Sequence, residues 1–81
     1  MPNALNELLK VLRADRLPTD YPIKGVSAAL TRLGYTEKVT GSHYVWRQKE
    51  HPRIVISVHD GKVPRAALED LQALFTKLGL L

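Results

Sequence analysis

Cysteine is absent from the 81-residue sequence, which excludes disulfides and thiolate metal sites and fits a reducing cytoplasm. Long apolar runs are also missing, since no stretch approaches the ~18 apolar residues that a membrane-spanning helix needs. Residues 1–16 mix acidic side chains into the apolar positions, so we expect no signal peptide. The composition therefore predicts one small cytoplasmic domain with no membrane segment.

Several catalytic patterns are lacking as well. The acidic residues form no motif that would cradle magnesium, and there is no glycine-rich phosphate loop and no recognisable Ser/His/Asp set. His43, His51 and His59 are spaced by eight residues each, which matches no compact zinc-ligand motif. If the chain performs chemistry, a lone imidazole is the best candidate for it.

Positive charge is concentrated in one part of the chain. The formal net charge is +4, and residues 38–65 account for all of it, with six basic side chains against two acidic ones. The six are Lys38, Arg47, Lys49, Arg53, Lys62 and Arg65. A local positive field attracts phosphates at long range. Basic side chains that merely solvate a small sheet would give the same pattern.

Apolar spacing predicts three helices. Leucines at the i, i+3, i+4 and i+7 positions indicate a first helix from an Asn3 N-cap to about Arg16. A connector with two prolines follows over residues 17–22. The same spacing predicts a second helix that Gly34 ends, and a third over residues 64–78 that opens on a proline.

Three strands are predicted between the second and third helices, over residues 35–40, 43–48 and 53–59. The order predicts an α+β fold in which helices cover one face of a three-stranded antiparallel sheet and the other face is open. We divide the chain into an N-terminal helix and linker, residues 1–23, and a main domain, residues 24–81.

Strand parity assigns side chains to the two faces of this sheet. The large apolar side chains should face the helices, namely Tyr44, Trp46, Ile54, Ile56 and Val58. The alternate positions should face solvent, namely His43, Val45, Arg47, Val55, Ser57 and His59. Trp46 is therefore expected in the core and not on the surface, where it would stack on bases.

The tripeptide Gly41-Ser42-His43 is the most informative motif, because a glycine turn delivers a histidine onto the start of a strand. One interpretation is an edge-strand histidine that happens to follow a turn. The other is a general acid or base that takes the proton from an RNA 2′-hydroxyl, so that this oxygen attacks the adjacent phosphate. Cleavage would leave a cyclic or 3′-phosphate end. Ser42 and nearby backbone N–H groups would stabilise the phosphoryl oxygens, with Arg47, Lys49 or Lys62 as cationic helpers.

The two other histidines are interpreted separately. His59 is a second proton-transfer group, a phosphate contact, or a strand-end residue that makes a local hydrogen bond. His51 lies before Pro52 in a loop, where we expect it to be solvated.

Several segments together resemble the HicA toxin family. They are residues 30–35 (LTRLGY), 41–47 (GSHYVWR), 55–59 (VISVH) and the closing helix through Gly79 and Leu80, and the match covers about residues 24–81. HicA proteins are small mRNA interferases with a double-stranded-RNA-binding-domain-like α-β-β-β-α fold, and HicB antitoxins bind and silence them. The chain departs from the family pattern at Ser57, where many members have proline, and at Ala66-Ala67, where many have glycine-threonine. The first 23 residues are extra.

The resemblance implies a metal-independent endoribonuclease with no cofactor, mRNA as its substrate and a HicB-like protein as its partner. It gives His43 the catalytic role. The expected RNA or phosphate contacts are Gly41, Ser42, Arg47, Lys49, His59 and Lys62. One alternative is a binding module that holds RNA or a protein on the same sheet without cleaving. Another is self-association through residues 3–13, whose leucine stripe either folds back on the core or meets another subunit.

Overall fold

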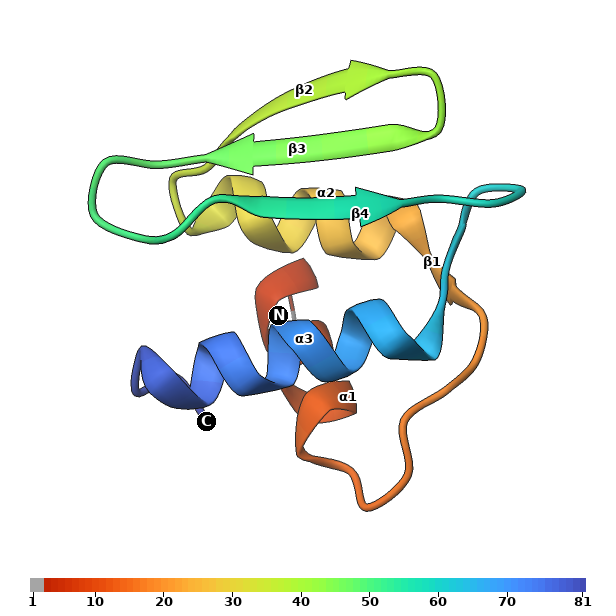
Figure 1. Cartoon of the computed structure of the whole chain (residues 1–81). Coiled ribbons are helices and arrows are strands. Elements are labelled where there is room, and N and C mark those ends of the chain that lie inside the picture. Colours follow the sequence, from red (N-terminus) through yellow and green to blue (C-terminus); the bar gives the residue numbers. More distant parts are fainter. Residues whose placement is uncertain (1–2) are drawn as a thin grey trace.

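The computed structural model describes residues 3–81 as an α+β domain with three helices and a three-stranded antiparallel sheet (Figure 1). The helices are α1 (Ala4–Arg13), α2 (Ile23–Arg32) and α3 (Arg65–Lys77). The sheet contains β2 (Thr36–Thr40), β3 (His43–Arg47) and β4 (Ile54–Ser57), in that order. The predicted α+β class and antiparallel sheet are confirmed. The first two residues of the predicted 1–23 segment lie outside the described residues.

The helices lie on one side of the sheet, with α2 and α3 running beneath β3 and β4 and α1 in contact with both helices (Figure 1). Leu8 and Leu12 of α1 are 0% and 1% exposed and belong to the same core as α2 and α3. The leucine stripe of residues 3–13 therefore folds back on the chain's own core, the first of the two alternatives.

The predicted side-chain faces are confirmed. Most of the inward set is buried in the core, with Trp46 0% exposed, Ile56 3% and Val58 7%, and Tyr44 is half-buried and packs against that core. Val55, on the opposite face, is 53% exposed. Pairing of Tyr44 with Ile56 and of Trp46 with Ile54 fixes the register of β3 on β4, so the alternation predicted from the sequence holds across both strands.

Glycine ends α2 as predicted. Gly34 has φ +92°, and the N–H of Tyr35 donates to the carbonyl of Leu30 at 3.1 Å while that of Gly34 donates to Thr31 at 3.0 Å. This is a Schellman motif, and Tyr35 and Leu30 are both buried beside it. The turn directs the chain out of α2 and into β2.

Two predicted ends are wrong. The helix α1 stops at Arg13 and not near Arg16, because Ala14 is extended and the chain then brings Leu17, which lies off the helix's apolar stripe, into the core. The third strand ends at Ser57 and not at His59. Beyond it, Asp60 and Gly61 have φ of 53° and 72°, the pattern of a two-residue type I′ turn.

That turn leads into a second, two-stranded sheet that was not predicted from the sequence. The short strands β1 (Tyr21–Pro22) and β5 (Lys62–Val63) pair antiparallel. The N–H of Ile23 also donates to the carbonyl of Gly61 at 2.9 Å. The proline-containing connector is thereby joined to the segment that follows β4. Within residues 3–81, no helix is both long enough and apolar enough to cross a membrane.

Candidate functional site

The turn Gly41-Ser42 joins β2 to β3, with Thr40 paired to His43 across it. Gly41 has φ +61° and Ser42 has a negative φ, the pattern of a type II′ hairpin turn. The carbonyl of Ser42 accepts a hydrogen bond from the N–H of Val58 at 2.8 Å. The turn is therefore held both by its own hairpin and by the chain that leaves β4.

His43 is exposed and pairs with Ser57 of β4. Its Nδ1 lies 3.2 Å from the Ser57 hydroxyl oxygen, which is hydrogen-bonding distance. Since directly opposed residues of antiparallel strands share a face, Thr40, His43 and Ser57 form one polar row across the open face. A histidine held at Nδ1 presents Nε2 to whatever approaches this face.

The neighbouring rows of the open face contain cations and apolar side chains. Lys38, Val45 and Val55 form the second row, and Thr36 and Arg47 begin the third. Glu37, the one acid in the described strands, faces the helices, where its carboxylate accepts hydrogen bonds from Trp46 Nε1 at 3.0 Å and from the Ser27 hydroxyl. The strand positions of the open face in residues 3–81 are therefore basic and free of carboxylates.

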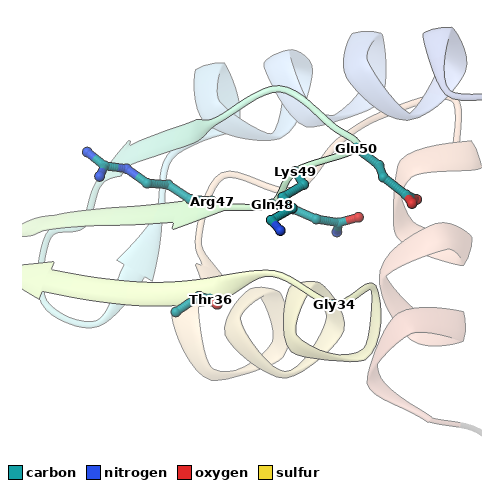
Figure 2. A pocket seen from close by; sticks show the side chains of 6 residues that line it. All are labelled: Gly34, Thr36, Arg47, Gln48, Lys49 and Glu50. Atoms are coloured by element: carbon teal, nitrogen blue, oxygen red, sulfur yellow. The ribbon is translucent and has the colours of Figure 1, made fainter.

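The predicted phosphate contacts divide between the two ends of β3. Arg47 is four residues beyond His43, which places their backbones about 13 Å apart at the usual rise of a strand. Arg47 and Lys49 line a hollow of about 620 Å³ (Figure 2), together with Gly34, Thr36, Gln48 and Glu50. The structure does not bring Arg47 or Lys49 beside His43.

The hollow is open and its side chains do not converge on one point. In Figure 2 the guanidinium of Arg47 extends back over the strands, whereas the carboxylate of Glu50 points to the opposite side. Gln48 is fixed between them, because its Nε2 donates to the carbonyl of Leu33 at 2.6 Å. Arg47 is thus directed toward the open face of the sheet and away from the nearby acid.

His59 and Lys62 lie at the His43 end of the sheet, because they follow Val58, which is bonded to Ser42. Their backbones bond to each other, with the N–H of Lys62 donating to His59 at 2.9 Å. They share a hollow of about 240 Å³ with Thr19, Asp20, Asp60 and Pro64. The two carboxylates lie beside Lys62 in this hollow, so its charge is partly offset there, whereas the described open-face strand positions carry no acid.

His51 differs from the expectation of a solvated loop residue. It is half-buried, its ring centroid lies 6.3 Å from that of Tyr35, and its Nδ1 is buried without a hydrogen-bond partner. The loop folds inward because the Tyr35 hydroxyl donates to the carbonyl of Pro52 at 3.1 Å. Burial raises the pKa of Tyr35 above its ordinary value.

Sequence reasoning missed the contact between His43 and Ser57. The signal was present, since strand parity put both residues on the open face, but only the register shows that they are directly opposed. Among residues 3–81, no three His, Asp or Glu side chains gather in a group that could hold a metal ion. No family model, curated protein or solved structure matches the chain.

Proposed function

We propose that the chain is a metal-independent endoribonuclease toxin of the HicA type, with His43 as its catalytic group. The observation that carries the proposal is an exposed imidazole, bonded at Nδ1 to Ser57, on a sheet face whose charged strand residues are Lys38 and Arg47. The order of α2, β2, β3, β4 and α3 also agrees with the α-β-β-β-α order of a double-stranded-RNA-binding-domain-like fold.

The proposed reaction uses Nε2 of His43, the ring nitrogen that does not contact Ser57. Nε2 of His43 removes the proton from a ribose 2′-hydroxyl, and the 2′ oxygen forms a bond to the adjacent phosphorus. The bond from phosphorus to the 5′ oxygen breaks, and the imidazolium returns its proton to that oxygen. The products are a 2′,3′-cyclic phosphate and a 5′-hydroxyl, and water can open the cycle to a 3′-phosphate.

Ser57 suits this role. A neutral imidazole that acts as a base at Nε2 must have its proton on Nδ1, and the Ser57 hydroxyl is placed to accept a hydrogen bond from that N–H. The same hydroxyl accepts equally well when both ring nitrogens are protonated. Ser42 lies beside His43 in the turn, where its hydroxyl can donate to a phosphoryl oxygen.

A HicB-like antitoxin would silence the enzyme by covering the open face. The face is basic, so the partner's complementary surface should carry carboxylates opposite Lys38 and Arg47. Such a partner would bury His43 and exclude RNA in a single contact.

The test is cleavage of a single-stranded RNA in the presence of a chelator. We expect His43→Ala to lower the rate by about 10²–10⁴-fold. A substrate with a 2′-deoxyribose at the cleaved position should not be cut at that position. His59→Ala is the matched comparison, because it removes the other exposed imidazole at the same end of the sheet. Undiminished cleavage by His43→Ala would refute the assignment, and RNA binding without turnover by the parent chain would favour the binding-module alternative.

A further inference from the structure

A pair of valines separates the polar row that contains His43 from Arg47. Val45 and Val55 are directly opposed on β3 and β4, and Val55 is 53% exposed. β-Branched residues are common on sheets, but here the half-buried Val45 and the exposed Val55 lie between an imidazole and a guanidinium on a face that is otherwise polar. Lys38 flanks Val45 on the other side, in β2.

We propose that Arg47 forms a second phosphate site for the same RNA strand, and that the ribose or base between the two phosphates packs on Val45 and Val55. The proposal rests on the proposed function, since the first phosphate is the one cleaved at His43. It assigns the substrate as single-stranded RNA that must extend beyond the scissile phosphate.

The spacing fits a short stretch of chain. His43 and Arg47 are about 13 Å apart along β3. Stacked nucleotides advance by about 3.4 Å each, so the two sites are separated by no more than about four nucleotides, and by fewer where the strand is extended. An Arg side chain that leans back over the sheet (Figure 2) shortens the span further.

The side chains along β3 also suit different parts of an RNA strand. A guanidinium offers a planar pair of donors to a phosphate, which favours binding but removes no proton. The valines offer apolar contact to an unpaired nucleotide, whose ribose and base are accessible only when the strand is single. The open face therefore combines the polar row of Thr40, His43 and Ser57, the apolar pair of Val45 and Val55, and a phosphate-binding cation, Arg47.

The test compares a dinucleoside monophosphate, which contains only the scissile phosphate, with a hexanucleotide of the same central sequence. We expect Arg47→Gln to lower kcat/KM for the hexanucleotide by about tenfold and to leave the dinucleoside monophosphate unchanged. The hexanucleotide's dependence of log kcat/KM on log salt should become shallower by about 0.7. Lys77→Gln, in the last turn of α3, is the control for loss of one positive charge elsewhere.

Failure of this inference differs from failure of the proposed function. If Arg47→Gln slows both substrates equally while His43→Ala abolishes both, the second site is wrong and the ribonuclease assignment stands. A non-cleavable 2′-O-methyl hexanucleotide, followed by fluorescence anisotropy, tests the site without turnover. Equal affinity of the parent and Arg47→Gln for this probe overturns the proposal, and weaker binding with a shallower salt dependence supports it.

Discussion

The two ends of β3 are supported in different ways. Beneath the Arg47 end, Trp46 is 0% exposed and Glu37 accepts its indole N–H. Beneath the His43 end, Tyr44 is only half-buried, and Val39, opposite it in β2, is 47% exposed. The Arg47 end of β3 thus lies over sealed core, whereas at the His43 end the β2 side of the sheet extends past it.

Main-chain hydrogen bonds, more than core packing, hold the His43 end of β3. The type II′ turn and the bond from Val58 to Ser42 hold His43 in place, and Ser57 orients its ring. A catalytic group must be accessible and so cannot be deeply buried, which is why the proposed function requires stability at one end of β3 and accessibility at the other. The two ends should therefore respond differently to substitution.

The largest loss of stability is expected at the Arg47 end of β3. Trp46→Ala should cost about 3–5 kcal/mol, because it empties a fully buried site and leaves the Glu37 carboxylate without one of its donors. That is a large fraction of the roughly 4–12 kcal/mol expected for a domain of this length. Urea unfolding measures it. Tyr44→Ala, beneath the His43 end, should cost clearly less, and equal losses would show that the two ends of β3 are packed alike.

At the His43 end of β3, a substitution that costs less stability than Trp46→Ala should still strongly reduce cleavage. Gly41→Val forces a β-branched residue to φ +61°, at a cost of about 1–2 kcal/mol, although its Cβ would meet no atom within 4 Å. Because the turn positions His43, cleavage should fall by about 10²-fold in protein that is still folded.

Gly79→Val is the matched control for the turn. Gly79 has φ +78° and is equally unobstructed, but it lies after α3, away from the open face. It should lose similar stability and keep its cleavage rate under conditions where it is folded. If both variants lose cleavage in proportion to stability, the turn has no special role in presenting the imidazole.

Local patterns predicted much of this architecture. The leucine spacing, Gly34 and the alternation of Trp46 with its neighbours gave the helices, a helix stop and the two faces of the sheet, because each depends on residues close in sequence. The pairing of β1 with β5 was not predictable in this way. It joins two-residue strands about 40 positions apart, too short for any periodic signal.

The candidate site was predictable in composition but not in arrangement. The open-face residues followed from parity, yet Arg47 and Lys49 were expected beside His43 because their chemistry suited phosphate. The strand rise alone separates them by about 13 Å. The direct opposition of His43 and Ser57 depends on where the loop between β3 and β4 ends, and loop composition does not fix that register.

A moderate effect is expected where Ser57 contacts the ring. Ser57→Ala removes the hydroxyl 3.2 Å from His43 Nδ1. In the proposed mechanism this hydroxyl accepts from Nδ1–H, so that tautomer should become less populated and kcat should fall about fivefold. Nitrogen-15 NMR of the imidazole reports the tautomer directly. Ser57→Thr keeps the hydroxyl and should retain both properties. An unchanged tautomer population in Ser57→Ala would show that the contact does not orient the ring.

The smallest effects on stability should appear at alkaline pH. One tyrosine near each end of β3 should cause them. Tyr35 packs near the Arg47 end, and burial raises its pKa. Tyr21, paired with Val63 near the His43 end, has its pKa raised first by burial and then by the charge of Glu7. The fold therefore favours both neutral phenols. Their contribution to stability is complete below pH ~10 and is lost as the pH rises through the raised values.

Tyr35→Phe should cost about 1 kcal/mol at neutral pH, because it removes the hydrogen bond to the carbonyl of Pro52. It should also make the decline of stability above pH ~10 shallower, so that the curves of the variant and the parent converge. Tyr21→Phe should flatten the decline as well, since its phenol is also held neutral by the fold. Urea midpoints between about pH 8 and about pH 11 measure both slopes. Parallel pH curves of stability for Tyr35→Phe and the parent would mean that the Tyr35 hydroxyl is solvated. The Arg47 end would then be more open than the 4% exposure of Tyr35 implies.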